Sequence, residues 1–195
     1  MTNRGIASFL VENGRFSDCA QANSLNEAKK YIEDSLSSKD FPSFIILDIL
    51  LGEANGLDFL PFLEDICNKN KVPKPPVLVC SVLEEPFRIQ TAIKLGACGY
   101  VSKADNEAGL LEAIDTVLRG EVYLSSKHSA KIVKSIGVYG KFTKRELRIL
   151  ELIKENKTNK QIANELSLHI RTVENHVSNI YFKTRAENRA ELIKM

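Results

Sequence analysis

The chain has 195 residues, a formal net charge of +2 and a hydrophobic fraction of 44%. This length allows one large domain or two small ones, and the hydrophobic fraction is enough for a packed core. No apolar run approaches the roughly 18 residues that cross a bilayer, and the first residues lack a signal-peptide pattern, so we expect a cytoplasmic protein without a membrane partner. The four cysteines form no C-x-x-C pair, which favours buried free thiols in a reducing compartment.

Two helix patterns precede the first clear strand. Ile6 to Leu10 carry the apolar positions of a helix that ends at Asn13-Gly14. Cys19–Ala22 is a short strand candidate. Ser24-x-x-Glu27 is a capping box, which predicts the start of a second helix with Leu36 on its inner face.

Strand and helix patterns then alternate along the chain. Runs of large apolar residues are typical of strands buried on both faces, and they occupy Phe44–Asp48, Val77–Ser81 and Tyr100–Lys103. A helix pattern follows each run, from about Leu57 to Cys67, from Pro86 to Gly96, and from about Asn106 to Arg119. This alternation predicts an α/β fold with a doubly wound parallel sheet.

Polar side chains stand at the ends of the three predicted strands: Asp48, Ser81 and Lys103. In open α/β sheets ligands gather at the carboxyl ends of the strands, so a carboxylate, a hydroxyl and an ammonium group there form a candidate site. Each residue alone has an ordinary explanation, because strand ends are often polar.

The stretch from Thr158 to Lys183 predicts two short helices. Thr158 and Gln161 form a capping box for the first helix, a break follows around Ser167 to His169, and the second helix begins near Ile170. At about 100° per residue, the second helix has one apolar side and one polar side. The apolar side holds Val173, Val177 and Ile180, and the polar side holds Arg171, Glu174, Asn175 and Ser178.

Short donors and acceptors on that polar side are what reading base edges in a major groove requires, and two short helices with a tight turn form a helix-turn-helix. Spacing alone fits an ordinary helix pair of an α-bundle equally well. Charge supports DNA: residues 141–195 contain 12 Lys+Arg and 7 Asp+Glu, a net of +5, whereas residues 1–140 contain 15 and 18, a net of −3. A basic module is drawn to a polyanion.

Several pieces of the C-terminal third resemble, in the right order, the LuxR-type helix-turn-helix of the NarL/FixJ response regulators: Phe142-Thr-Lys-Arg-Glu146, Asn159-Lys-Gln-Ile-Ala163, Thr172-Val173, His176 and Ser178-Asn179-Ile180. The resemblance implies binding to double-stranded DNA as a homodimer. It implies base contacts by Glu174, Asn175 and Ser178. It implies phosphate contacts by Lys160, Arg171, Thr172 and Lys183. Phe182 and Thr184 depart from the basic and aliphatic residues usual in the family.

Most of residues 1–125 resembles the receiver domain of the same regulators, through the three strand ends and through Gly96–Lys103 and Arg119–Ser125. The resemblance implies that Asp48 takes a phosphoryl group from a sensor histidine kinase, that Ser81 donates a hydrogen bond to it and that Lys103 pairs with its charge. Tyr100 matches the aromatic residue that swings inward on activation. A half-buried strand tyrosine explains Tyr100 equally well.

The start of the chain departs from the receiver pattern. A receiver normally begins with a strand and a pair of acidic residues that hold Mg²⁺, whereas residue 1 here aligns with the first helix, and Thr2, Asn3 and Arg4 cannot supply that pair. We therefore expect only a weakened Mg²⁺ site at Asp48. The missing strand would be the middle one of a 2-1-3-4-5 sheet, so we also expect a gap between its neighbours.

We predict a flavodoxin-like receiver domain, shortened at its N-terminus, over residues 1–124. A linker helix follows over residues 125–141, with Ile132, Val133 and Ile136 inward, and a small all-α helix-turn-helix domain covers residues 142–195. The function predicted is that of a DNA-binding transcriptional response regulator of a two-component system, without enzyme activity, controlled through Asp48. The alternatives are a DNA-binding regulator that needs no phosphorylation and an adaptor that pairs with a full-length regulator. An α/β hydrolase is disfavoured because no G-x-S-x-G motif is present.

Overall fold

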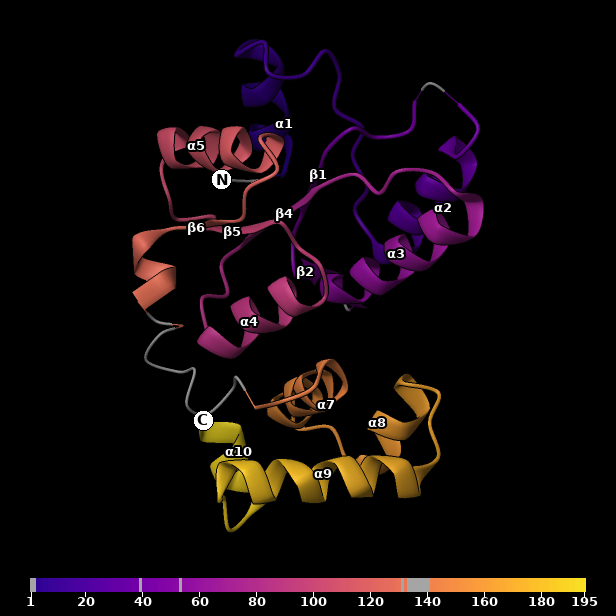
Figure 1. Ribbon diagram of the computed structural model, residues 1–195, viewed down its shortest axis with the longest axis vertical. Helices are drawn as coiled ribbons and strands as arrows, with labels where there is room; N and C mark the ends of the chain where they lie inside the picture. Colours follow the sequence, from indigo (N-terminus) through magenta and orange to yellow (C-terminus); the bar gives the residue numbers. More distant parts are fainter. Residues whose placement is uncertain (1–2, 39, 53, 131, 133–140) are drawn as a thin grey trace. The chain divides into compact units, whose positions relative to one another are not determined.

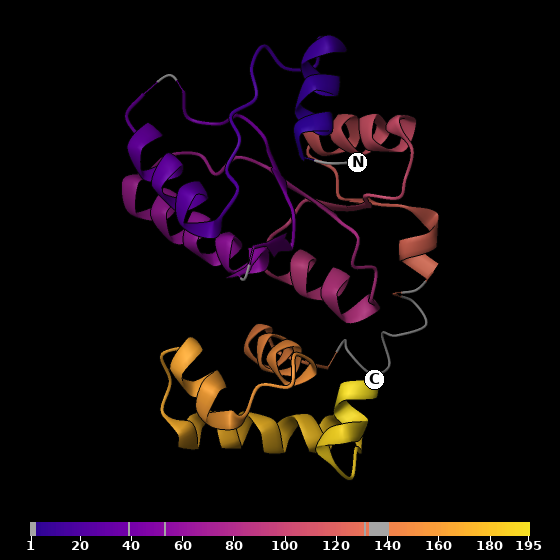
Figure 2. The same ribbon diagram turned by 180° about the vertical axis from the view of Figure 1, so that it is seen from behind.

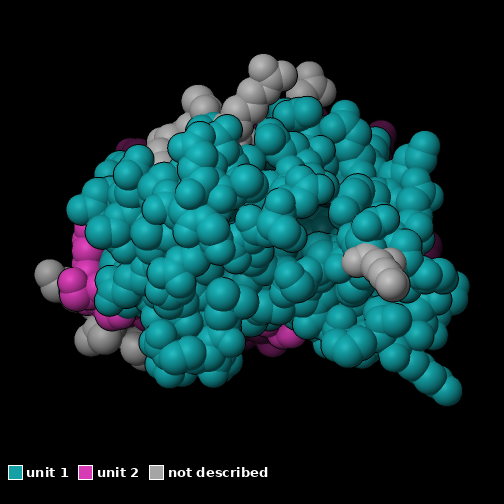
Figure 3. Space-filling model, turned by 90° about the horizontal axis from the view of Figure 1, so that it is seen from above, with its two compact units in different colours: residues 1–84, 95–125 teal, residues 85–94, 126–195 magenta. Residues whose placement is uncertain are grey.

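The alternation of strands and helices is present in the structure, a computed structural model that describes residues 3–38, 40–52, 54–130, 132 and 141–195 (Figure 1). Internal contacts divide the chain into two compact units, coloured separately in Figure 3. The first unit comprises residues 1–84 and 95–125, and the second comprises residues 85–94 and 126–195.

The first unit contains the sheet and the helices around it. Its elements are α1 (Asn3–Glu12), α2 (Leu25–Ser35), β1 (Ile45–Leu47), β2 (Leu50–Leu51), β3 (Ala54–Asn55), the 3-10 helix η1 (Gly56–Asp58), α3 (Phe59–Asn70), β4 (Val77–Ser81), β5 (Gly99–Ser102), α5 (Glu107–Leu118) and β6 (Tyr123–Leu124). The second unit is helical, with α4 (Pro86–Lys94), α7 (Lys144–Lys154), α8 (Asn159–Glu165), α9 (Ile170–Thr184) and α10 (Arg189–Lys194).

Four parallel strands form the main sheet in the order β1-β4-β5-β6. Ile45 of β1 lies opposite Val77 of β4, and Ser81 of β4 lies opposite Ser102 of β5. The three strands expected from the sequence are therefore confirmed, and so is the parallel sheet. Two further pairings are not apparent from the sequence: β6 beside β5, and an antiparallel hairpin of β2 and β3. Each of these strands has two residues, which is too short to show an alternating pattern.

The sheet ends at β1 instead of opening into a gap. Cys19–Ala22 forms no strand, and no strand of the described residues pairs with β1 on the side away from β4. The predicted strand and the predicted gap are both wrong. Because the strand predicted at Cys19–Ala22 is not formed, β1 is the edge of the sheet, and Phe16 packs against Phe44 there, with ring centroids 5.6 Å apart.

Helices α1 and α5 lie side by side on one face of the sheet in both ribbon views (Figures 1 and 2). Ile6 and Leu10 of α1 share a buried cluster with Leu110 and Ile114 of α5 and with Leu78 of β4. Side chains of a strand alternate between the two faces of a sheet, so the residues before and after Leu78 in β4 point to the opposite face. This packing on both faces holds the carboxyl ends of the strands in place.

The core of the second unit joins α7, α8, α9 and α10, and it also contains Phe87 of α4. Capping boxes at Thr143 and Thr158 begin α7 and α8, the second of them as predicted, and in both the side chain three residues later bonds back to the cap. The predicted inner residues of α9 are buried, namely Val173, Val177 and Ile180, and the apolar residues Leu147, Leu150, Leu152 and Ile153 of α7 are buried with them. Of the predicted linker helix, Ile132 is helical, while Val133 and Ile136 lie outside the described residues.

Charged side chains of α7 are buried among these apolar residues. Glu151 is fully buried and accepts hydrogen bonds from Nη1 of Arg88 at 2.7 Å and from Nη1 of Arg148 at 2.9 Å. Arg148 also donates to Oε1 of Glu165 at 3.1 Å. Each charge tolerates burial because it has an oppositely charged partner within hydrogen-bond distance.

Glu146 connects the start of α7 to the end of α9. Its carboxylate lies 2.6 and 2.8 Å from the ammonium nitrogen of Lys183 and accepts the backbone N–H of Thr143 at 2.7 Å. Burial alone would raise the pKa of Glu146. The hydrogen bonds from Lys183 and Thr143 outweigh burial, so the pKa of this carboxyl lies below its ordinary value.

The four cysteines are free, as expected, but they are not all buried. Cys67 and Cys80 are buried, whereas Cys19 and Cys98 are partly exposed. Within the described part of the chain, none of the helices has both the length and the apolar character needed to cross a membrane.

Replacing Glu151 by Gln is expected to lower the free energy of unfolding of the second unit by about 2–4 kcal/mol, because the largely buried guanidinium groups of Arg88 and Arg148 each lose a negative partner. Urea unfolding followed by circular dichroism measures the loss. The control is Glu155→Gln, at an exposed position at the end of α7, which we expect to cost less than about 0.5 kcal/mol. Equal losses in the two variants would show that the buried ion pairs do not stabilise the unit.

Acidification is expected to destabilise the second unit through Glu146. Because the pKa of this carboxyl is lowered in the folded state, its contribution is fully present above the ordinary value of 4.5 and is lost as the pH falls through the lower folded-state pKa. Glu146→Gln removes the contribution at every pH. The two proteins should therefore differ most in free energy of unfolding at neutral pH and converge as the pH falls below 4.5. A difference that stays constant with pH would contradict this assignment.

Candidate functional site

The carboxyl edge of the sheet brings two of the predicted site residues into direct contact. Asp48 follows β1, and Lys103 follows β5. The Asp48 Oδ2 atom lies 2.6 Å from the Lys103 ammonium nitrogen, and the two side chains are 11% and 14% exposed. Oδ1 of Asp48 accepts the backbone N–H of Leu50 at 3.1 Å. The carboxylate is therefore oriented by a cation on one oxygen and by its own loop on the other.

Gly56 holds the loop that carries Asp48 close to the hairpin. Its N–H donates to the Ile49 carbonyl at 2.7 Å, and a Cβ atom at this position would overlap the carbonyl oxygen of Asp48. The close approach therefore requires glycine.

Ser81 and Tyr100 lie beside this ion pair in the sheet. Ser81 is fully buried at the end of β4, and its hydroxyl accepts the N–H of Leu83 at 3.4 Å. The N–H of Lys103 donates to the Ser81 carbonyl at 3.0 Å, which ties the two strand ends together. Tyr100 is fully buried, and its hydroxyl donates to the Leu83 carbonyl. The tyrosine ring therefore points into the domain, and it is not half-buried.

The described residues do not by themselves fit a Mg²⁺ site. Among residues 3–38, 40–52, 54–130, 132 and 141–195, no group of three or more His, Cys, Asp or Glu side chains could hold a metal. One oxygen of Asp48 is engaged by Lys103 and the other by Leu50. A hard cation needs several oxygen ligands, and these residues offer one carboxylate.

Cys80 adds no nucleophile to this edge. Burial raises the pKa of its thiol to about 11, with a smaller opposing effect of Lys103. A thiol with this pKa is protonated at neutral pH, and the thiolate is the reactive form.

The helix-turn-helix of the second unit is held by two arginines of α7. Arg145 donates to the Leu166 carbonyl at 3.0 Å, and Arg148 pairs with Glu165 at 3.1 Å, so both bind the C-terminal end of α8. The turn follows at Ser167, whose φ is +50°, and α9 begins after His169. The contacts of these arginines with α8 are not apparent from the sequence, although their i, i+3 spacing at the start of α7 places them on one side of that helix.

The predicted base-contacting residues lie together on the outer side of α9. Asn175 and Ser178 are exposed, and Glu174 is 44% exposed at its side chain. Arg171, 84% exposed, stands 3.6 Å from Glu174. The opposite side of the helix is buried in the core through Val173, Val177 and Ile180. The structure therefore separates a buried face from a polar, accessible one, as the spacing predicts.

The predicted phosphate-contacting residues differ in how accessible they are. Lys160 is exposed in the first turn of α8, and Thr172 is partly buried in the first turn of α9. The ammonium group of Lys183 is bound to Glu146. Lys160 and Arg171 are thus accessible to a polyanion, whereas Lys183 contributes to the attachment of α9.

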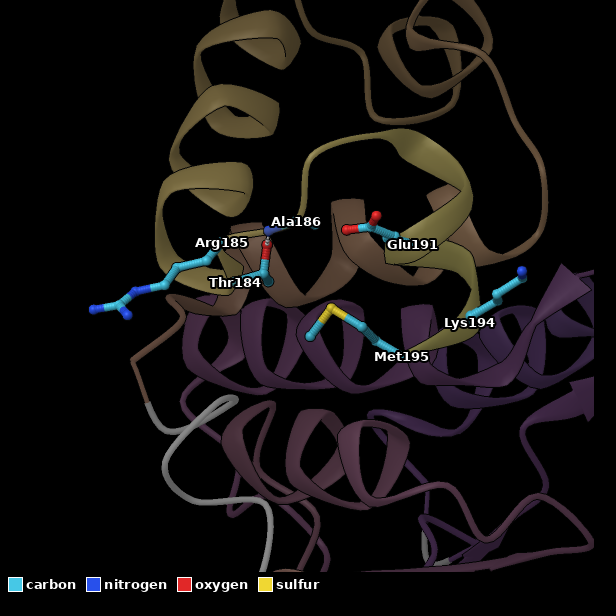
Figure 4. Close-up of a pocket in the computed structure, with 6 residues that line it drawn as sticks. All are labelled: Thr184, Arg185, Ala186, Glu191, Lys194 and Met195. Carbon is cyan, nitrogen blue, oxygen red and sulfur yellow. Dashed lines mark hydrogen bonds between the residues drawn. The ribbon is translucent and has the colours of Figure 1, made fainter.

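A shallow depression lies where α9 meets α10, lined by Thr184, Arg185, Ala186, Glu191, Lys194 and Met195 (Figure 4). The Thr184 hydroxyl accepts the N–H of Ala186 at 3.2 Å, and Glu191 accepts the N–H of Glu187 at 2.9 Å. The Arg185 side chain points away from the depression in Figure 4. These polar groups cap helix ends, which explains their positions without a ligand.

Comparison with known proteins identifies both parts of the chain. The family model for the response regulator receiver domain matches residues 2–115, and the model for bacterial regulatory proteins of the luxR family matches residues 141–195. The transcriptional regulatory protein LiaR of Bacillus subtilis (strain 168) is 30% identical over 198 residues, which cover 98% of this chain and 89% of LiaR. The probable transcriptional regulator ycf29 of Cyanophora paradoxa is 35% identical over 156 residues, covering 77% of this chain and 73% of that protein.

A solved structure shows the same fold. RcsB from Salmonella enterica serovar Typhimurium, bound to promoter rprA in the presence of phosphomimetic BeF3-, aligns with a TM-score of 0.72 at 18% identity, over 98% of this chain and 90% of RcsB. The predicted fold class and the family resemblance are both confirmed. The chain belongs to the transcriptional response regulators of two-component systems, which join a receiver domain to a LuxR-type helix-turn-helix.

Proposed function

We propose that α9 enters the major groove of duplex DNA and that Glu174, Asn175 and Ser178 contact base edges there. The observation that carries this proposal is the accessible polar side of α9, on a helix whose other side is fully packed. A major groove about 12 Å wide admits one α-helix. Asn pairs with adenine through two hydrogen bonds, and Glu accepts from the amino group of cytosine.

Phosphate contacts position the helix on the duplex. Lys160 and Arg171 have accessible charges, and Thr172 offers a hydroxyl and sits in the first turn of α9, where backbone N–H groups also attract anions. The phosphate role of Lys183 requires its release from Glu146. A homodimer on two half-sites is the arrangement that helix-turn-helix proteins use to double their contacts. The chain acts by binding, without an enzyme activity of its own.

For the receiver, we propose that Asp48 accepts a phosphoryl group from a sensor histidine kinase. The carboxylate is bound to Lys103, whose ammonium would then pair with the added negative charge, and the Ser81 hydroxyl would donate to a phosphoryl oxygen. If Lys103 leaves the Asp48 carboxylate for the phosphoryl group, the contacts at the end of β5 would change. Tyr100 is also part of β5. Cytoplasmic location remains a prediction of the sequence.

One observation favours regulation that does not depend on phosphorylation. The Tyr100 ring is already buried, and its hydroxyl already bonds to the loop after β4, with Asp48 unmodified. If the inward tyrosine marks the active arrangement, the receiver reaches that arrangement through its own packing. No observation specifically favours the adaptor alternative.

Asn175→Ala is expected to cost about 1–3 kcal/mol on the best operator and to relax specificity at one base pair, because it removes a base contact. Lys160→Ala should weaken all sequences alike and reduce the slope of log affinity against log salt by about 1. Fluorescence anisotropy with selected and scrambled duplexes measures both effects. The control is Lys30→Ala, which removes an exposed charge from α2 and should change neither. If all three variants bind like the wild type, α9 is not the DNA-contacting helix.

Incubation with a small acyl phosphate donor and Mg²⁺ is expected to label the wild type and Asp105→Asn but not Asp48→Asn. Asp105 is the control because it lies in the same loop as Lys103 and is also partly buried. Mass spectrometry of the intact protein detects the label. An unlabelled wild type that still binds DNA would support the phosphorylation-independent alternative, and a labelled Asp48→Asn would exclude Asp48 as the acceptor.

A further inference from the structure

Phe182 is the most exposed of the large hydrophobic residues that the structure describes. Its side chain is 86% exposed on α9, whereas the next values are 60% at Val122 and 59% at Val82. Exposure of a whole phenyl ring is unfavourable in water. A ring in this position, on the helix proposed to contact DNA, is available for an apolar contact.

The ring lies on the same side of α9 as the proposed base contacts. At about 100° per residue, Phe182 projects within about 40° of Arg171, Asn175 and Ser178 and opposite the buried Val177 and Ile180. With a rise of about 1.5 Å per residue, it stands about 6 Å beyond Ser178 along the helix axis. Phe182 thus extends the exposed polar stripe by one further turn.

The chemistry of the ring selects what it can contact in a major groove. A phenyl ring has neither a hydrogen-bond donor nor an acceptor, so it cannot match the polar groups of the base edges. The C5 methyl group of thymine is the apolar group that a major groove presents, and it takes apolar contacts from side chains. A phosphate would be a poor neighbour for the ring because it would lose hydration without gaining a hydrogen bond.

We propose that Phe182 is a specificity-determining residue that contacts the methyl group of a thymine. Along α9, this contact lies one turn of the α-helix beyond the base contact of Ser178. The inference rests on the proposed function of α9 and adds an apolar position to its polar ones. It predicts an operator half-site with a preferred thymine at the end that faces the C-terminal part of the helix.

The surroundings of Phe182 favour a single methyl group over a protein partner. The residues three and four positions before it are Asn179 and Ser178, and the residue three positions after it is Arg185, all exposed. Protein interfaces usually bury a cluster of apolar side chains in their centre. Phe182 is an isolated apolar side chain among polar ones, which suits a small apolar group within a polar groove.

The experiment removes the methyl group from the DNA and the ring from the protein. An operator is first selected from a random duplex pool with the full wild-type chain, and each thymine in it is then replaced singly by uracil. For wild type, one such replacement should weaken binding roughly fourfold, the effect of one buried methyl-sized group. For Phe182→Ala the same replacement should have no effect, while affinity for the thymine duplex should already be lower by a similar factor.

Two variants serve as controls. Asn175→Ala should weaken binding but keep the difference between thymine and uracil at the Phe182 position. Phe182→Leu should keep part of that difference, because leucine retains an apolar contact. Since Phe182 is almost fully exposed and alanine favours helices, the variants should unfold at the wild-type temperature.

Equal affinity of the wild type for thymine and uracil at every position would overturn the inference and leave the proposed function intact. An equal loss of affinity for the thymine and uracil duplexes in Phe182→Ala would also overturn it. The same holds if Phe182→Ala keeps its affinity for DNA but no longer binds a protein partner. Failure of the wild type to bind any duplex would overturn the proposed function, and the inference with it.

Discussion

Buried charges on α7 are the constraint on which the DNA-binding unit depends. Glu146 binds Lys183 near the end of α9, while Arg145 and Arg148 bind the carbonyl and carboxylate at the end of α8. Charges that are costly to bury are stable only when their partners stay in place. One helix therefore orients both members of the helix-turn-helix. The stripe on α9 is presented in a fixed direction while Lys183 is bound to Glu146, because release of the lysine would take a cationic partner from a buried carboxylate.

Paired charges also hold elements of the receiver together, but with fewer charged groups. Asp48 and Lys103 come from two strands that are not neighbours, and β4 between them supplies Ser81. Their meeting follows from the parallel order of the strands, since all three carboxyl ends face one edge. The ion pair makes the Asp48 carboxylate part of the domain's structure, so a change of charge at Asp48 would alter the link between the ends of β1 and β5.

The sequence predicts the long elements and the polar face of α9, because these depend on periodicity and capping within a few residues. Thr143, Thr158 and the buried run of β4 are of this kind. The sequence does not predict features that depend on contacts between residues far apart in the chain. The hairpin at Leu50–Leu51 is too short for a pattern, the end of the sheet at β1 depends on a segment that forms no strand, and the binding of Lys183 by Glu146 joins residues far apart in the chain. The roles of Asp48, Asn175 and Lys160 remain predictions.

The absence of a side chain at Gly56 has a consequence for how the receiver can vary. Any larger residue would press on the main chain of Asp48, where the carbonyl oxygen occupies the space that a Cβ atom would need. Such a change would displace the Asp48 carboxylate relative to Lys103, although both side chains would still be present. A substitution at Gly56 would therefore alter the position of Asp48 through steric contact alone.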